Sequence, residues 1–211
     1  MTSAYTEPRF MLDLMNLFFL SSDPQECAEM HADKHVVKSA FRNASNSRIE
    51  FTEFTLVVIL ETAQLLSTAH RVLDGVDYLL AADGTKSPAR KGTLPDEREG
   101  VLYKVTHVNH PCAKWVRVND GNYLWAFALF TELCDEYTYR YNKVHATTRL
   151  TKALATPPTH IKMGTMTAPA LAMPDEFKIE NDAVASYRNY YKQGKQHLHA
   201  WKKRSHPLWI N

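Results

Sequence analysis

The 211-residue chain is poor in cysteine and glycine and has no long uncharged apolar segment. Its three cysteines are odd in number, widely spaced and form no CxxC pair. This usage favours buried thiols in a reducing, cytoplasmic compartment over a disulfide framework. Seven glycines supply no phosphate loop or dinucleotide fingerprint, and the sequence has neither a GxSxG elbow nor a zinc finger. A transmembrane helix needs about 18 or more consecutive apolar residues, so we expect no membrane association.

Helical periodicity dominates what is present. Apolar residues recurring at helical spacing predict helices over 25–38, 57–75, 122–141 and 183–201. The segments 81–100 and 156–177 are rich in proline, glycine or charge and are typical of loops. We therefore expect a mostly α protein, a compact single-domain helical bundle with long loops that is monomeric.

The N-terminal sequence is a poor signal peptide, because it lacks a basic start and Asp13 interrupts its apolar run. Met15 offers an internal translation start. On that interpretation residues 1–14 are an N-terminal extension, and residues 15–211 form the single helical domain.

The first predicted helix has strong start signals. Asp23 is placed to cap it, Pro24 occupies the first helical position, and Glu26 completes a capping box. Within this helix His31 and His35 are four residues apart and so share a face.

The intervening Asp33 and Lys34 add a carboxylate and an amine to the same short segment. An imidazole pair with these neighbours predicts one wall of a polar pocket.

Ten histidines are many for this length. If the histidines of the first helix met His70, His110 and the carboxylate of Glu61, the group could carry acid–base chemistry. Four imidazoles could alternatively bind a divalent transition metal, with His31, His35, His70 and His110 as ligands. Equally, they could be buried histidines that bond to their neighbours. No metal or other cofactor is our first expectation.

The C-terminal segment is basic. From Ala183 to the end there is no Asp or Glu, and tyrosine and tryptophan alternate with the cations. Cations for phosphates and flat rings for unstacked bases are what a nucleic-acid contact needs. The alternative is a surface helix with solvated lysines. The cations considered are Arg188, Lys195, Lys202, Lys203 and Arg204.

Two further segments combine cations with rings. "NHPCAKWVR" brings Lys114, Trp115 and Arg117 together, which suits either a nucleotide contact or a core tryptophan flanked by snorkelling cations. "ELCDEYTYRYNKVH" places Arg140 and His145 near one another. Arg140 could hold a phosphate or belong to an ion-pair ladder along a helix.

Several segments resemble a family found largely in marine phages and related viruses. They are "MNLFFLSSDPQECAEMHADKHVVK", "ILETAQLLSTAHR", "HVNHPCAKWVR", "EYTYRYNKVH", "LAMPDEFK", "SYRNYYKQGK" and "WKKRSHPLW". The family is often labelled pyrimidine dimer DNA glycosylase, after a more distant likeness to the endonuclease V of T-even phages. The resemblance covers nearly the whole chain from Met15. In that family "DKHVVK" leads almost directly into "ILETAQ", so residues 39–58 are a probable insertion.

The resemblance implies a compact helical DNA-repair enzyme that acts on damaged pyrimidines in double-stranded DNA, in the host cytoplasm if the protein is viral. Such enzymes expose a damaged base, attack the sugar C1′ with an amine, and form a Schiff base that permits strand cleavage. A carboxylate stabilises the developing positive charge. In the phage enzyme the amine stands just before the "NL" pair, here Asn16 and Leu17. The amine here would belong to Met15 as the true start, or to Lys34, and the carboxylate to Asp33 or Glu61.

Three hypotheses therefore precede the structure. The first is a base-excision DNA glycosylase with AP-lyase activity. The second is a metal-dependent hydrolase or base-modifying enzyme that uses the histidines. The third is a non-catalytic DNA-binding accessory protein, whose DNA binding would be salt-sensitive and without turnover.

Overall fold

The computed structural model describes residues 16–33, 58–76 and 92–211, and it confirms a mostly α fold. The described α-helices, in chain order, are α1 (Pro24–Met30), α3 (Val58–Asp74), α4 (Arg98–Val101), α5 (Pro111–Val116), α6 (Asp120–Tyr141), α7 (Thr151–Leu154) and α8 (Ala183–Gly194). The short 3-10 helices are η2 (Ala146–Leu150), η3 (Asp175–Phe177), η4 (Gln196–Leu198) and η5 (Leu208–Ile210). No strand occurs in the described ranges. The predicted extension 1–14, and the predicted insertion 39–58 apart from Val58, lie outside them.

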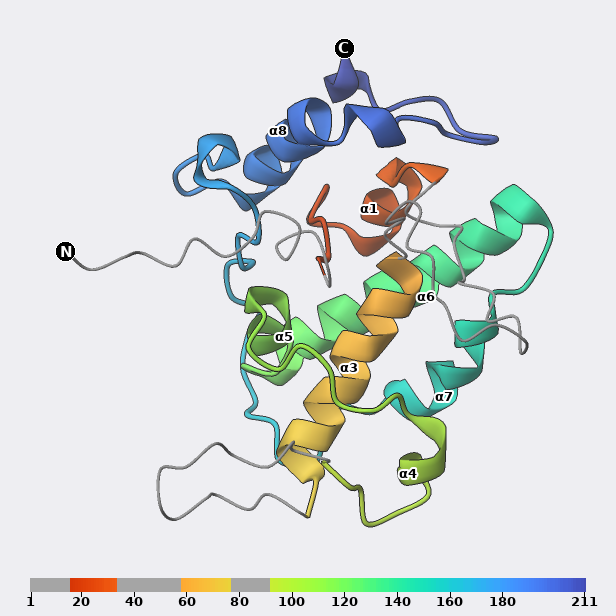
Figure 1. Cartoon of the computed structure of the whole chain (residues 1–211), viewed down its shortest axis with the longest axis vertical. Coiled ribbons are helices and arrows are strands. Elements are labelled where there is room, and N and C mark those ends of the chain that lie inside the picture. The colour runs from red at the N-terminus through yellow and green to blue at the C-terminus, as the bar shows by residue number, and fades with distance from the viewer. Residues whose placement is uncertain (1–15, 34–57, 77–91) are drawn as a thin grey trace, which may run out of the picture.

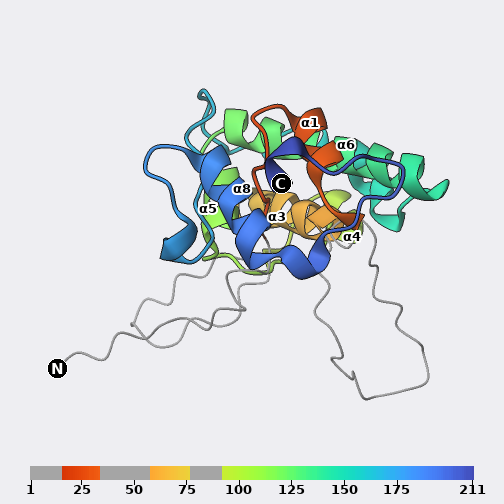
Figure 2. The ribbon, with the colours of Figure 1, turned by 90° about the horizontal axis from the view of Figure 1, so that it is seen from above.

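The core is built around two crossing helices. Helix α6 packs against both α1 and α3, and α3 also packs against α5 (Figure 1). Helix α8 and the residues after it spread across one end of this core, as the view from above shows (Figure 2). None of the helices in the described part of the chain is long and apolar enough to cross a membrane.

The two central helices match their sequence signals. Helix α3 ends at Asp74, just before Gly75, as predicted. Helix α6 starts two residues before the predicted Asn122, because the Asn119 side chain accepts a hydrogen bond from the Asn122 backbone N–H at 2.8 Å and caps the helix. At its other end Asn142 takes a left-handed conformation (φ 52°) and stops the helix.

Helix α1 begins as predicted but ends much earlier than residue 38. Asp23 caps it and Pro24 opens it, whereas the Glu26 carboxylate accepts from the Ser21 hydroxyl instead of completing a capping box. His31 already has an extended backbone (ψ 134°).

The early end has a physical cause in the C-terminal segment. The Ala32 N–H donates to the Tyr191 hydroxyl at 2.6 Å, and the Asp33 N–H donates to the Ala200 carbonyl at 2.7 Å. Partners far away in the sequence therefore take the donors that a longer helix would use. As a result, the predicted one-turn spacing of His31 and His35 within a single helix is wrong, and Lys34 and His35 themselves lie outside the described residues.

The last helix is also shorter than predicted. Helix α8 stops at Gly194 instead of residue 201. The His199 ring lies 3.0 Å from the Tyr191 carbonyl and donates to it, which satisfies an acceptor in the last turn of the helix. The chain then turns through η4 and returns along α1.

The predicted loop 81–100 contains structure in its described part. Arg98 begins α4, and residues 92–104 fold against Arg71, which is fully buried. The Arg71 guanidinium donates to the carbonyls of Gly92, Leu102 and Tyr103 and to Glu99. Gly92 has φ +52°, and a Cβ there would come within 2.9 Å of Arg71, so this close approach requires glycine.

Candidate functional site

The "NL" pair lies at a junction of three buried segments. The Asn16 side chain is buried and donates to the Ala172 carbonyl at 2.5 Å. The Cys112 sulfur of α5 is 3.9 Å from the Asn16 side-chain oxygen. The backbone of Leu17 interacts with both the Cys112 thiol and the His31 ring. We call the surroundings of these two residues the Asn16–Leu17 junction.

Glu61 brings a buried carboxylate to this junction. It lies in the first turn of α3 and is 7% exposed. Burial raises the pKa of Cys112 to about 11, and the negative charge of Glu61 raises it further. The charge of this carboxylate therefore acts on the thiol that lies 3.9 Å from the Asn16 side-chain oxygen.

His110 stands at the edge of the same junction. Its Nδ1 accepts the Cys112 backbone N–H at 3.2 Å and caps α5. Because Nδ1 accepts, Nε2 carries the ring proton. That atom is buried and has no hydrogen-bond partner among the residues that the structure describes. Of the predicted catalytic residues, His31 thus interacts with the Leu17 backbone, whereas Glu61 and His110 are linked to the "NL" pair through Cys112.

The imidazoles of this group are neutral near pH 7. Burial lowers the pKa of His31 and that of His110 to about 4. The nearby positive charge of Arg140 lowers that of His31 further. The His31 ring is fully buried, lying with Nδ1 2.7 Å from the Cys27 carbonyl. Both rings suit a hydrogen-bonding role better than that of a cationic acid.

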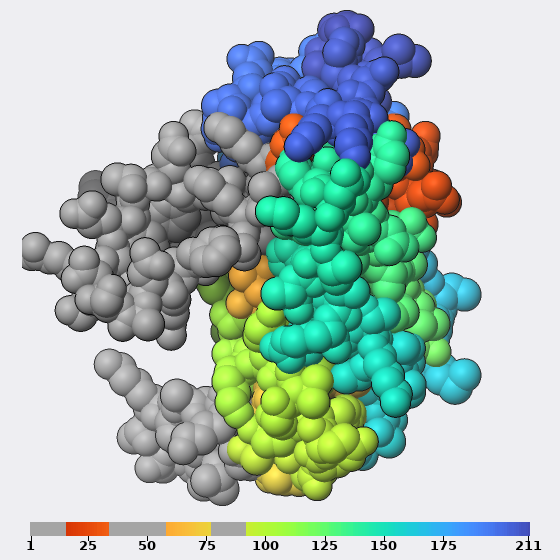
Figure 3. All heavy atoms as spheres, turned by 90° about the vertical axis from the view of Figure 1, so that its right-hand side faces the viewer, coloured from red at the N-terminus to blue at the C-terminus, as the bar shows by residue number. Residues whose placement is uncertain are grey.

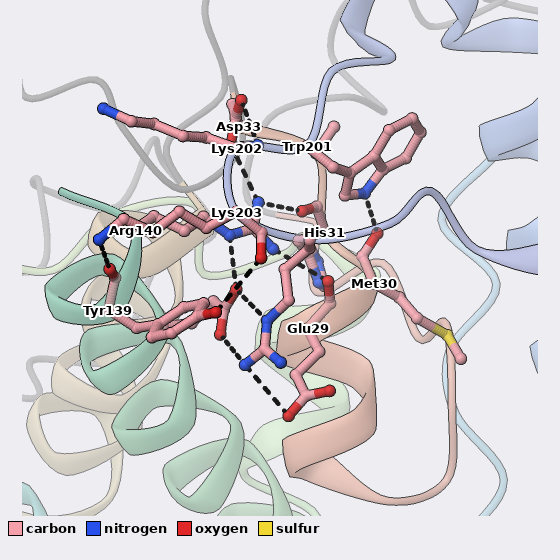
Figure 4. Close-up of polar contacts among 12 residues, drawn as sticks. Glu29, Met30, His31, Asp33, Tyr139, Arg140, Trp201, Lys202 and Lys203 are labelled. Carbon is pink, nitrogen blue, oxygen red and sulfur yellow. Dashed lines mark hydrogen bonds and ion pairs between the residues drawn. The ribbon is translucent and has the colours of Figure 1, made fainter.

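Asp33, a predicted catalytic carboxylate, has a structural role. Its oxygens accept the Lys202 backbone N–H at 2.9 Å and an Arg140 N–H at 3.1 Å (Figure 4). The carboxylate therefore fastens the C-terminal segment to the end of α1.

Arg140, predicted to contact DNA, is fully buried, which is incompatible with that contact. It donates to the carbonyls of Glu29 at 2.9 Å and His31 at 2.8 Å and to the Glu136 carboxylate at 2.5 Å (Figure 4). A helix that ends early leaves carbonyls without partners, and Arg140 satisfies those of α1. It is a structural residue.

Lys202, Lys203 and Arg204 contact the C-terminal part of α6 at the protein surface. Arg204 pairs with Glu136 at 2.8 Å, and the Lys203 ammonium donates to the Tyr139 carbonyl at 2.7 Å (Figure 4). The Lys202 ammonium lies 4.9 Å from the centre of the Tyr141 ring. Lys202 and Lys203 remain exposed, and their contact with DNA stays a prediction.

Three other residues predicted to contact DNA lie inside the protein. Trp115, His145 and Lys195 are 5%, 5% and 4% exposed. Trp115 packs edge-on against Phe19 in the core, so the core-tryptophan alternative holds. His145 caps η2. These placements do not allow the predicted contacts.

The remaining candidates are at or near the surface. Lys114 is exposed, whereas Arg117 and Arg188 are partly buried. Arg117 donates to the carbonyls of Val108 and Ala113, and Arg188 donates to that of Leu20. Lys114 is thus the less constrained of the two cations in "NHPCAKWVR", and the DNA contacts of Lys114, Arg117 and Arg188 stay predictions.

His70 does not join the junction. It lies nine residues after Glu61 on α3 and faces a separate cleft of about 580 Å³. The walls come from α4, η2, α7 and the loop after α7, which lie on one side of α3 (Figures 1 and 3). The cleft is lined by His70, Glu97, Arg98, Val101, Arg149, Lys152, Ala153, Thr156, Pro157 and Thr159.

The floor of this cleft is a hydrogen-bond chain. Arg98 donates to His70 Nδ1 at 2.9 Å, so Nε2 carries the proton and donates to the Tyr123 hydroxyl at 2.8 Å. Tyr123 in turn donates to the Leu154 carbonyl at 2.9 Å. Burial and the charge of Arg98 lower the pKa of His70 to about 4, so the ring is neutral.

Asp74 organises the cleft from below. Its carboxylate accepts from Arg98 at 2.7 Å, from the Thr159 N–H at 3.0 Å, and from the His160 N–H and ring at 3.1 and 3.0 Å. Although burial opposes it, these hydrogen bonds hold the pKa of Asp74 down at about 2. One buried carboxylate therefore fixes both the α4 wall and the loop after α7.

The predicted metal site is not assembled. Both ring nitrogens of His70 are occupied, one by a cation, and the His31 ring is bound at Cys27 at a different place. Within 16–33, 58–76 and 92–211 no three metal-ligating side chains gather. The set His31, His70 and His110 is therefore wrong as a ligand set, and His35 lies outside the described residues.

Apart from His70, sequence reasoning missed the residues that line the cleft or support it. Asp74 is four residues after His70 on α3, a spacing that places the two on one helix face. Arg149 and Lys152 are three residues apart. Neither spacing is specific. Arg98, which binds both His70 and Asp74, comes from a segment expected to be a loop.

Comparison of the chain with protein-family models, with curated proteins and with solved structures gave no match.

We expect Arg140→Met to lower the free energy of unfolding by about 3–5 kcal/mol, because it leaves Glu136 and the α1 carbonyls without their buried partner. Urea denaturation measures this. Lys143→Met, at an exposed position three residues after Arg140 and beyond the end of α6, should change stability by less than about 0.5 kcal/mol. Equal effects of the two substitutions would contradict the role given to Arg140.

We expect His70 to add to acid lability. Its pKa is about 4 in the folded protein and 6.5 in its unperturbed state, so between these values only the unfolded chain takes up the proton. Its contribution to stability is thus complete above pH 6.5 and is lost as the pH falls towards 4. Between pH 7 and 5 the wild type should lose about 2 kcal/mol more than His70→Gln. Urea denaturation at several pH values measures this, and parallel pH profiles would refute it.

Proposed function

We propose that the protein is a DNA-repair enzyme, a base-excision DNA glycosylase with AP-lyase activity that acts on damaged pyrimidines in double-stranded DNA. The proposal starts from the resemblance of the sequence to the phage pyrimidine dimer glycosylase family. The observation that carries it further is Glu61, a buried carboxylate whose charge acts on Cys112, the thiol 3.9 Å from the Asn16 side-chain oxygen.

The arrangement suits the chemistry that the resemblance implies. An amine just before Asn16 would attack the sugar C1′ and expel the base, and the resulting Schiff base would permit strand cleavage. A carboxylate at this place would stabilise the positive charge that develops on the sugar. Glu61 fits this role better than Asp33, whose oxygens are held by Arg140 and Lys202. The amine of a chain that begins at Met15 is our first choice of nucleophile.

His31 and His110 would complete the site as neutral groups. The buried Nε2 proton of His110 is a donor without a protein partner among the described residues. A hydrogen bond from this atom to an oxygen or nitrogen of the extruded nucleotide would meet that need.

The test is covalent trapping. A chain that begins at Met15 should form a borohydride-stable complex with duplex DNA that carries an abasic site or a pyrimidine dimer, detected by a shift in gel mobility. The full-length chain and the Met15 form with Lys34→Ala show which amine reacts. Absence of both trapping and strand cleavage in every form would refute the proposal. Salt-sensitive DNA binding without turnover would support the accessory-protein alternative instead.

Glu61→Gln should lower the rate of trapping at least about 100-fold, since it removes the charge aimed at the developing cation. Glu180→Gln, an exposed carboxylate far from the junction in sequence, should react at the wild-type rate. Urea denaturation of both variants checks that they fold. Wild-type trapping by a folded Glu61→Gln protein would remove Glu61 from the mechanism.

A further inference from the structure

We propose that the cleft between α4 and α7 binds the 5′-phosphomonoester of a nucleoside. This site is separate from the Asn16–Leu17 junction, because nine residues of α3, or about 14 Å of helix, separate Glu61 from His70, the α3 residue that lines the cleft. The inference does not rest on the proposed glycosylase activity.

The cleft has the dimensions of a small-ligand site. Its volume of about 580 Å³ lies within the range of about 300–1,000 Å³ that is usual for such sites. Three of its ten lining residues are apolar, and the other seven are polar or charged. Val101, Ala153 and Pro157 supply the apolar surface, which suits the faces of a sugar and a base.

Two cations on one wall lack acidic partners. Arg149 and Lys152 line the cleft, are exposed, and form no ion pair with any carboxylate of the described residues. Arg149 is positioned by one hydrogen bond to the Val101 carbonyl at 3.1 Å and by the Tyr103 ring, 5.5 Å from its guanidinium. A guanidinium has five N–H donors, so most of those of Arg149 remain for a ligand. A phosphate dianion fits this pair of cations.

The opposite wall has a different character. The charge of Arg98 is already balanced by Asp74 and Asp96, at 2.7 and 2.6 Å. Glu97 also lines the cleft, is exposed, and has no cationic partner among the described residues. A carboxylate accepts hydrogen bonds, and Thr156 and Thr159 add hydroxyl groups. These groups suit sugar hydroxyls and base N–H donors, so the site fits a nucleotide better than inorganic phosphate.

Hydrogen bonds between protein groups hold the walls of the cleft together. His70, Tyr123 and Leu154 connect Arg98 to α7 through consecutive hydrogen bonds, and Asp74 binds Arg98 and the backbone of Thr159 together. Both walls are thus fixed to α3. A ligand that enters such a cleft loses little binding free energy to ordering the protein.

The experiment is isothermal titration calorimetry on the full chain. The four 2′-deoxynucleoside 5′-monophosphates test a free nucleotide as the source of the phosphomonoester, and a 5′-phosphorylated single strand tests a DNA end. Inorganic phosphate, an unphosphorylated nucleoside and the same strand with a 5′-hydroxyl are the controls. We expect saturable binding of at least one phosphomonoester that is at least about tenfold tighter than binding of its control.

Lys152→Glu should weaken that binding at least about tenfold, because it replaces attraction of the phosphate with repulsion. Lys143→Glu makes the same charge change at an exposed position that does not line the cleft and should bind as the wild type does. Urea denaturation confirms that both fold. The proposal is overturned if no phosphomonoester binds, if inorganic phosphate or the 5′-hydroxyl strand binds equally well, or if the two variants behave alike.

Covalent trapping by the Glu61 site is measured independently. Trapping that survives in Lys152→Glu while nucleotide binding is lost would show two separate sites. Loss of trapping in Glu61→Gln with nucleotide binding intact would also show that the two sites are separate. Failure of the glycosylase proposal therefore leaves this test unaffected.

Discussion

Helix α3 is a central helix that buries ionisable side chains, and the segments around it are placed so as to pair them. A buried guanidinium or carboxylate without partners would be strongly destabilising. Arg71 meets this constraint by binding three carbonyls and Glu99 of residues 92–104. Asp74 meets it by binding Arg98 and the loop after α7. The pairing of Asp74 with Arg98 and with the loop after α7 therefore orders the segments that form the cleft walls.

The requirement that buried polar groups have partners also explains the contacts between α1 and the C-terminal segment. Helix α1 ends early, and its last carbonyls would be unsatisfied without Arg140 of α6. Asp33 and Ala32 then bind the C-terminal segment at Lys202 and Tyr191. A basic tail that could have been a free nucleic-acid arm is therefore packed against α1 and α6, and much of its charge is used within the protein. Exposed Lys202 and Lys203 are what remains for a partner.

Periodicity and capping residues were sufficient to predict α3, α6 and the start of α1, since these depend on side chains within one or two turns. They were not sufficient for the ends of α1 and α8, where Tyr191 and His199 supply partners through contacts made after the chain has folded back. For the candidate site, the sequence analysis considered Glu61, His31 and His110 together because carboxylates and imidazoles are the groups that acid–base chemistry uses, and their catalytic roles stay predictions. The contacts of Asp33 could not be foreseen, because its partner Arg140 is 107 positions away in the sequence. Arg149 and Lys152 were missed because their spacing is not specific and because α4, on the other side of the cleft, comes from a segment expected to be a loop.

The most direct test of this account is hydrogen exchange in Arg71→Met, which keeps the apolar stem and removes the buried guanidinium. The account predicts that backbone amides of residues 92–104 lose protection while those in the middle of α6, from Ala126 to Leu133, keep theirs. The wild-type pattern of protection across 92–104 in this variant would contradict the claim that the buried charges of α3 order the segments around it.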